Sequence, residues 1–301
     1  AAKISNNEDF TINSVTVGKG ANSVAGNTVL GNAALDASVS GGDNTAIGSS
    51  ALTENTSGAN NTAVGSVALD VNTTGSSNTG VGRSALGGNT TGDYNTALGH
   101  GSLLSNTTAD SNTAVGYLAL NLNTTGAKNV AVGGYTLDAN TTGDGNTAIG
   151  RSALGANTTG ANNVALGRSA ALNITTASDS IAIGHDALYT EDTQSSLVAI
   201  GTAAMYKNNS GTENTAIGRS ASYHNVTGVS NTAIGYVALH NNTASNNTAL
   251  GTRALEANTT GTSNTAVGAN ALDSNTTASN NTAVGGNCLQ ANTTGTDNNA
   301  V

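Results

Sequence analysis

The sequence predicts an all-β fold: a parallel β-solenoid, of the β-roll or β-helix kind, with coils of about 17 residues. Three observations predict it. One phrase, such as NTAVGSVALDVNTTGSS at residues 61–77, recurs along nearly the whole chain. Aliphatic residues within the phrase are spaced by two, which is typical of a strand. A unit this short cannot offset the entropy of ordering its own backbone, so it must stack on its neighbours.

The repeat has a nearly constant length. With the first Asn of the phrase taken as column 1, the chain holds 18 repeat starts from Ser14 to Asn298, and the last repeat is incomplete. The starts are evenly spaced except for a shorter first step, from Ser14 to Asn27, and a step from Asn231 to Asn247 that lacks a single residue. Residues 14–301 are therefore predicted to form a single repeat solenoid, and residues 1–13 an N-terminal cap or connecting strand.

Columns 2 to 5 predict a short strand that ends at a corner. Column 4 is Val, Ile or Leu in all 18 repeats, and column 2 is Thr, Val or Ile in all but one. Because Val and Ile replace Thr at column 2, we expect columns 2 and 4 to point inward. Column 3 is Ala in 15 repeats and is then expected to point outward, as a smooth stripe for close packing by another chain. Column 5 is Gly wherever it is present, which indicates positive φ or no room for a Cβ.

The remaining columns predict a packed segment and a polar turn. Column 8 is small and column 9 is mostly Leu, so Met205 and Cys288, which stand in these columns, are interpreted as packing residues. Columns 12 to 15 usually read Asn-Thr-Thr-Gly, a turn sequence. Asn occupies column 1 in 15 repeats, and we expect these amides to hydrogen-bond along the axis of the stack.

Composition excludes several classes of protein. Charged residues make up 9% of the chain and the net charge is −9, which does not suit a nucleic-acid binder or an anionic membrane surface. No apolar run is long enough to cross a bilayer, so we expect no membrane insertion. One cysteine rules out a disulfide framework. No nucleophile–base set, phosphate loop or metal-ligand spacing stands out, so we expect no enzyme, no catalytic or metal residues and no cofactor.

Several segments resemble repeats of known families. SVTVG at residues 14–18, NVAVG at 129–133 and SIAIG at 180–184 resemble the head repeats of trimeric autotransporter adhesins. NTAVGYLALNLNTTG at 112–126 is similar to repeats in tail-fibre proteins of bacterial viruses. The resemblance implies a left-handed parallel β-roll, a homotrimer, and a place at a cell or virion surface. The adhesin repeats are shorter than those of this chain, so their cross-section does not carry over directly.

Two sets of residues are candidates for contacts with other molecules. Column 10 is aromatic in four consecutive repeats, which predicts a ladder that contacts a glycan or another partner; the alternative is a plain surface ladder. Its members are Tyr189, Tyr206, Tyr223 and His240. The turns also repeat the N-x-S/T sequence, which indicates either glycan acceptors or turn chemistry, the interpretation we prefer. The candidate acceptors include Asn72, Asn89, Asn106, Asn123, Asn140 and Asn157.

The predicted function is a structural fibre or adhesin, a rigid extracellular or virion rod whose loops attach to a surface such as a cell-surface glycan. The expected partner is the chain itself. The resemblance and the expected alanine stripe favour a homotrimer. A head-to-tail filament is the other possibility, because the chain ends four residues into a repeat and so leaves a strand edge unpaired. The alternative is an ice-binding solenoid that uses rows of Thr. Against that alternative, the Thr of column 2 is expected to point inward, and the Thr of columns 13 and 14 belong to turns.

Overall fold

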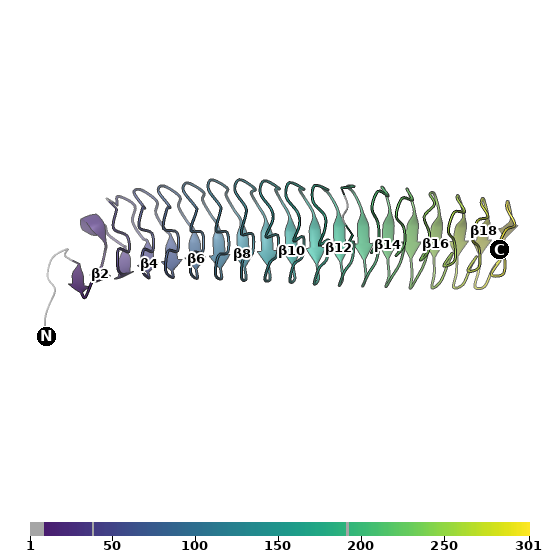
Figure 1. Cartoon of the computed structure of the whole chain (residues 1–301), viewed down its shortest axis with the longest axis horizontal. Helices are drawn as coiled ribbons and strands as arrows, with labels where there is room; N and C mark the ends of the chain where they lie inside the picture. The colour runs from purple at the N-terminus through teal and green to yellow at the C-terminus, as the bar shows by residue number, and fades with distance from the viewer. Residues whose placement is uncertain (1–8, 38, 191–192) are drawn as a thin grey trace. The chain divides into compact units, whose positions relative to one another are not determined.

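A computed structural model of the chain describes residues 9–37, 39–190 and 193–301. It divides into two compact units, Ala1–Asn146 (unit 1) and Thr147–Val301 (unit 2), and each is described by itself. Part of the segment expected to cap the chain, residues 1–8, lies outside the described residues. Within each unit the fold is the predicted parallel β-solenoid: from β3 on, each repeat contributes one short strand to the stack, and the strands of successive coils lie side by side (Figure 1).

The described residues of unit 1 form nine strands and one short 3₁₀ turn. Their bounds are β1 Phe10–Ile12, β2 Val15–Gly18, η1 Ala21–Ser23, β3 Thr28–Gly31, β4 Thr45–Ile47, β5 Thr62–Val64, β6 Thr79–Val81, β7 Thr96–Leu98, β8 Thr113–Val115 and β9 Val130–Val132. From β3 to β9 the strands pair in parallel with each column opposite itself, as in Thr62 beside Thr79 and Val64 beside Val81. Stacking by one repeat per layer is therefore confirmed.

The first repeat of unit 1 differs from the others. Strand β2 pairs antiparallel with both β1 and β3, so the chain enters the stack through a meander. Parallel stacking thus begins at β3, one repeat later than the expected start at Ser14. The short step from Ser14 to Asn27 is the sequence signal of this difference, because it leaves too few residues for a full coil.

In unit 2, residues 147–190 and 193–301 form ten strands that pair in parallel from the first to the last. Their bounds are β10 Thr147–Ile149, β11 Val164–Leu166, β12 Ile181–Ile183, β13 Val198–Ile200, β14 Thr215–Ile217, β15 Thr232–Ile234, β16 Thr248–Leu250, β17 Thr265–Val267, β18 Thr282–Val284 and β19 Asn299–Ala300. The shortened repeat that begins at Asn231 leaves the register intact, because Thr232 still lies opposite Thr248. The missing residue is absorbed in the loop.

The predicted orientation of the strand side chains is wrong. Column 3 points inward, and its alanines, such as Ala46, Ala63 and Ala97, are fully buried. A Cβ added to Gly80, the glycine of this column, would lie 3.4 Å from the side chain of Leu69 in column 9 and 3.0 Å from a backbone oxygen of column 8. The interior between strand and opposite wall is therefore filled by the leucines of column 9 and has room only for a methyl group from the strand.

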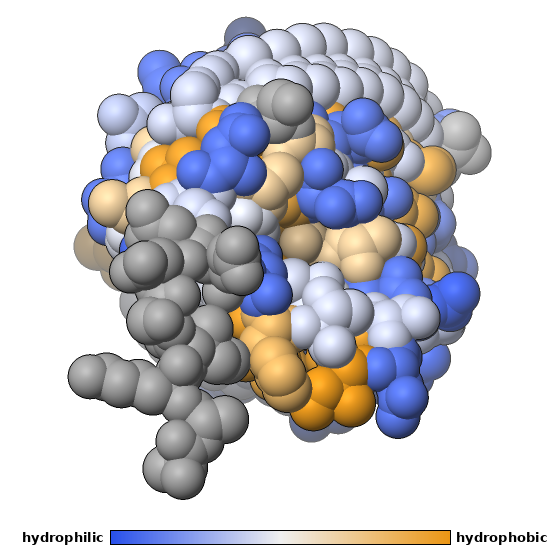
Figure 2. Space-filling view, turned by 90° about the vertical axis from the view of Figure 1, so that its left-hand side faces the viewer, coloured by the Kyte–Doolittle hydropathy of each residue, from blue (hydrophilic) through white to orange (hydrophobic). Residues whose placement is uncertain are grey.

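Columns 2 and 4 consequently face outward. Ile47, Val64 and Val81, expected in the interior, are half-buried on the outer face of the sheet, where each lies between the column-4 residues of the two adjacent layers. The expected outward stripe of alanine does not exist. Like residues stand in the same column. The end-on space-filling view therefore shows residues of similar hydropathy in rows that run away from the viewer, one layer behind another (Figure 2).

The predicted glycine corner is confirmed at column 5. Gly65 has φ +142°, and a Cβ there would lie 2.4 Å from the carbonyl oxygen of Gly82 in the next coil. Column 9 also adopts left-handed backbone, although it is mostly leucine: Leu52 and Leu69 have φ of 54° and 51°. Their side chains are fully buried, as expected for a packing column. Met205 is fully buried in the same column, whereas Cys288 is half-buried.

Two buried asparagine columns brace each coil. The backbone N–H of Asn61, in column 1, donates to Oδ1 of Asn44 in the preceding coil at 2.9 Å, so the expected amide ladder exists. Column 12 forms a second ladder, in which Nδ2 of Asn72 donates to Oδ1 of Asn55 at 3.0 Å. The Nδ2 groups of Asn61 and Asn72 also donate to the same carbonyl oxygen, that of Gly75. These bonds tie the strand to the turn within each coil and to the neighbouring coil.

Candidate functional site

The outer face of the sheet is the first candidate surface. It presents two rows in register, Thr or a β-branched aliphatic residue at column 2 and an aliphatic residue at column 4. Several column-4 side chains are well exposed, among them Leu98 at 48% and Leu250 at 45%. Neither column carries a charged residue in any repeat. This aliphatic row carries no charge, is half-buried in most layers and is exposed in others. Such a row is typical of a surface that contacts another molecule.

The aromatic ladder of column 10 is the second candidate surface, and the structure confirms that its four predicted residues stack. The rings of Tyr189 and Tyr206 lie 4.9 Å apart and parallel, those of Tyr206 and Tyr223 lie 5.0 Å apart, and His240 follows at 5.1 Å. This spacing matches the distance between layers of roughly 4.8 Å. Because each inner ring face is covered by its neighbour, the ladder offers its ring edges rather than its faces to a partner.

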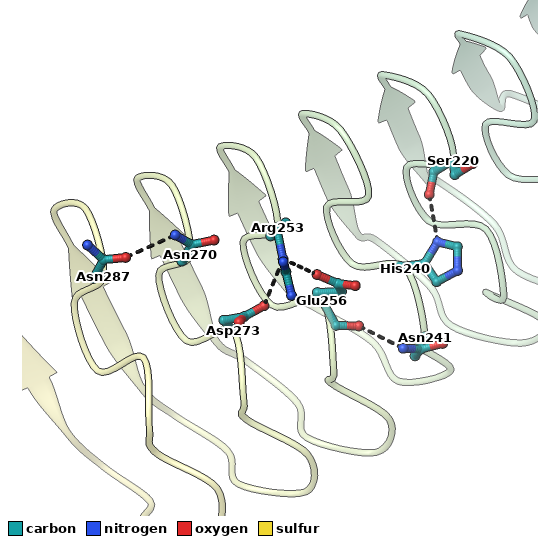
Figure 3. Close-up of polar contacts among 8 residues, drawn as sticks. All are labelled: Ser220, His240, Asn241, Arg253, Glu256, Asn270, Asp273 and Asn287. Carbon is teal, nitrogen blue, oxygen red and sulfur yellow. Dashed lines mark hydrogen bonds and ion pairs between the residues drawn. The ribbon is translucent and has the colours of Figure 1, made fainter.

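Polar groups surround this ladder. Nζ of Lys207 lies 5.9 Å from the ring centre of Tyr223, and His224 packs edge-on against Tyr223. Burial lowers the pKa of His224, and the nearby Lys207 and His240 lower it further. Nδ1 of His240 lies 3.1 Å from the backbone oxygen of Ser220, which fixes the last ring (Figure 3).

An open groove of about 500 Å³ runs beside the first two rings of the ladder. Besides Tyr189 and Tyr206, its lining comprises Asn173, Thr190, Lys207, Asn209 and Val226. These amide, hydroxyl and ammonium groups can exchange hydrogen bonds with a polar ligand. The contact of the ladder with a glycan stays a prediction.

A further aromatic cluster in unit 1 was missed by sequence reasoning. The rings of His100 and Tyr117 stack at 5.5 Å, and Tyr135 packs edge-on against Tyr117 at 5.3 Å. His100 and Tyr117 share column 6 in successive repeats, which was the available signal; Tyr135 stands one column later. Its members are more exposed than those of the column-10 ladder, with Tyr117 at 47%.

The predicted glycan acceptors have a structural role in the turns. All six are fully buried, and each donates a hydrogen bond inside the coil, as Asn89 does to the carbonyl oxygen of Gly92 at 3.0 Å. The six are Asn72, Asn89, Asn106, Asn123, Asn140 and Asn157. A glycan on such a side chain has no space in the folded coil, so the geometry favours the turn-chemistry interpretation.

Within the described part of the chain, no three His, Cys, Asp or Glu side chains gather as a metal site, and no helix is long and apolar enough to span a membrane. The fold and its surfaces thus define a class, the β-solenoid repeat proteins in which one sequence repeat forms one coil. Comparison of the chain with protein-family models, with curated proteins and with solved structures finds no match. The adhesin and tail-fibre resemblance therefore stays a prediction, as does the left-handed coil.

Proposed function

We propose that the protein is a structural fibre or adhesin whose outer sheet face associates with further copies of the same chain, as a homotrimer at a cell or virion surface. The observation that supports this best is the half-exposed aliphatic row of column 4, present in every coil. Burying such a row contributes about 25 cal/mol for each Å² of apolar surface. A second copy has the same distance between layers, so its rows can match this face layer by layer.

Substitutions within single coils test the association. We expect the wild-type chain to sediment as an oligomer at micromolar concentration, and L98K/L250K to sediment as a monomer with an unchanged circular dichroism spectrum. The matched control is H100K/T252K, which places the same charges in column 6 of the same two coils. It is expected to remain oligomeric. A monomeric wild type, or equal loss in both variants, contradicts the proposal.

Electron microscopy of negatively stained samples separates lateral from end-to-end association. Side-by-side assembly predicts bundles that disappear in L98K/L250K. Long filaments that persist in this variant support head-to-tail stacking instead. Glycan attachment by the aromatic ladder is tested separately: Y189A/Y206A/Y223A is expected to lose attachment while it keeps the oligomeric state.

Ice binding is a second candidate, and one observation favours it. The reason for setting it aside was the inward orientation of the column-2 threonines, and these residues in fact face outward. Six consecutive strands of unit 1 carry Thr there in parallel register: Thr28, Thr45, Thr62, Thr79, Thr96 and Thr113. A regular row of hydroxyl and methyl groups is suited to holding ordered water. This function requires an uncovered face. Thermal hysteresis of the wild type that T62K/T96K abolishes supports it, and a wild type that shows no thermal hysteresis contradicts it.

A further inference from the structure

All five arginines of the chain lie directly after the glycine corner. Arg83, Arg151, Arg168 and Arg219 occupy column 6, and Arg253 occupies column 7. No Asp or Glu stands in column 6 of any repeat, although the chain has a net charge of −9. Most carboxylates stand instead in the columns of the opposite wall and the turn, columns 10, 11, 16 and 17. The arginines are therefore gathered along one edge of the coils, apart from most of the acidic groups.

Unit 2 holds the longest part of this edge, which we name the basic stripe: Arg151, Arg168, His185, Arg219 and Tyr236. The three arginines are exposed, and Tyr236 is 49% exposed. Since each layer adds roughly 4.8 Å, Arg151 and Arg168 stand in adjacent layers, and Arg219 follows about 14 Å further along. The stripe is thus a line of cationic and aromatic side chains along the stack.

The arginines of the basic stripe lack the partners that neutralise Arg253. Nε of Arg253 lies 2.6 Å from Oε2 of Glu256 and 3.7 Å from Oδ1 of Asp273, and these carboxylates hold the pKa of Arg253 above its ordinary value (Figure 3). Among the described residues, no carboxylate forms an ion pair with Arg151, Arg168 or Arg219. Their charge is therefore available to a ligand.

Contacts inside the stripe keep the side chains close together. Nη2 of Arg168 contacts Nε2 of His185, whose Nδ1 lies 3.2 Å from Oδ2 of Asp186. The guanidinium of Arg219 lies 5.7 Å from the ring centre of Tyr236, a cation–π contact. Asp186 neutralises part of the charge at the centre of the stripe. Like charges in adjacent layers repel each other, and a bound anion relieves that repulsion.

We propose that the basic stripe binds an acidic polysaccharide, a linear sugar chain that bears carboxylate or sulfate groups. Guanidinium groups form paired hydrogen bonds with planar anions such as carboxylate, and the half-exposed Tyr236 adds aromatic surface for contact with a sugar. A linear ligand fits a linear stripe. The proposal lies beyond self-association, because column 6 is separate from columns 2 and 4.

The charge balance favours a polysaccharide over a nucleic acid. Duplex DNA carries one charge per roughly 1.7 Å, so a chain with a net charge of −9 repels it strongly. A polysaccharide with its charges further apart interacts with the local arginines while it experiences less of the overall repulsion. This difference makes polynucleotide the informative competitor.

The test compares two triple variants with the same net charge. R151S/R168S/R219S removes the stripe, and Ser already occupies column 6 at Ser49 and Ser66, so the coil accepts it. K19S/K128S/R253S removes three positive charges outside both the stripe and the groove beside the aromatic ladder. We measure binding of the full chain to immobilised polygalacturonate (carboxylate), heparin (sulfate), neutral dextran and duplex DNA, at low and at physiological salt.

We expect the wild type to bind at least one acidic polysaccharide and not dextran, the stripe variant to bind at least tenfold more weakly, and the control to bind within about twofold of wild type. Which of the two polysaccharides binds identifies the anionic group. Equal loss in both variants, preference for duplex DNA, or no binding to either polysaccharide at low salt overturns the proposal. Sedimentation of the same samples reports the oligomeric state, so failure of this inference is distinguishable from failure of the proposed association.

Discussion

Left-handed backbone at defined columns shapes each coil at the scale of single residues. In addition to the column-5 glycines, non-glycine residues in columns 7, 9 and 17 have positive φ near 50–60°. Val67, Leu69 and Ser77 are the examples in one coil. Each such residue costs on the order of 1–2 kcal/mol. Burial of one leucine contributes about 1.5–3 kcal/mol, so the leucine of column 9 does little more than offset its own strain. The hydrogen bonds between coils must therefore contribute to stability.

Replacement of Gly65 by alanine tests the corner. The φ of +142° and the carbonyl oxygen of Gly82 at 2.4 Å from an added Cβ both oppose the substitution. We expect G65A to lower the free energy of unfolding, measured by denaturant titration, by about 1–3 kcal/mol. The control is G134A, where the added Cβ meets only one backbone oxygen, at 3.8 Å. A similar loss in both variants contradicts the role of the corner.

Asp138 gives a prediction for pH dependence. Burial raises the pKa of this carboxyl above its ordinary value of 3.8, against a smaller opposite effect of its own backbone N–H. A raised folded-state pKa means that the unfolded state ionises more readily, so stability is fully present below pH 3.8 and is lost as the pH rises through the folded-state pKa.

We therefore expect D138N to be more stable than the wild type at pH 7 and equal to it near pH 3, as measured by urea titration at both values. D36N is the control, because Asp36 stands in the same column of unit 1 but is exposed. An equal effect of D138N at both pH values contradicts the argument.

At the scale of the strand, the space left inside the coil decides which face of the strand is buried. Each three-residue strand alternates outward, inward, outward, and the inward residue must fit against the leucines of column 9. The period of two identifies which residues share a face, and it cannot identify the face that lies inside. The mixture of Thr with Val at column 2 was the available clue to exposure, because a buried hydroxyl requires a partner.

Substitutions at adjacent positions of β8 test this orientation. Ala114 is fully buried, so A114V overpacks the interior and is expected to lower the free energy of unfolding by about 1–3 kcal/mol. T113V adds no comparable volume on the outer face, where other repeats already carry Val, and is expected to change it by less than about 0.5 kcal/mol. A tolerated A114V together with a harmful T113V would restore the original orientation.

At the scale of the molecule, the repeat length made most of the fold predictable. One coil per repeat, the corner at Gly65, the packed Leu69 and the stacked Tyr206 all follow from the requirement that identical columns lie above one another. What the repeat could not show was the identity of the face turned inward and the lack of ion-pair partners for Arg151. Both depend on distances across the coil and between side chains, which a periodic pattern does not contain.

Removal of whole coils tests the modularity of unit 1. Deletion of residues 78–94 removes one complete repeat and joins equivalent columns, so we expect a circular dichroism spectrum like that of the wild type and a cooperative thermal transition within a few degrees of it. Deletion of residues 78–85 places a loop opposite a strand. This shorter deletion is expected to abolish the cooperative transition, and equal behaviour of both deletions contradicts the stacking of one repeat per layer.

The shortened repeat that begins at Asn231 shows where the coil tolerates a change of length. Thr232 and Thr248 keep their pairing although one residue is missing between them, so the change is taken up at the turn. A foreign peptide inserted at that turn should leave the strand ladder unaltered. The protein is therefore suited to serve as a scaffold that displays inserted epitopes at intervals set by the layers, with the choice of coil determining the distance between them.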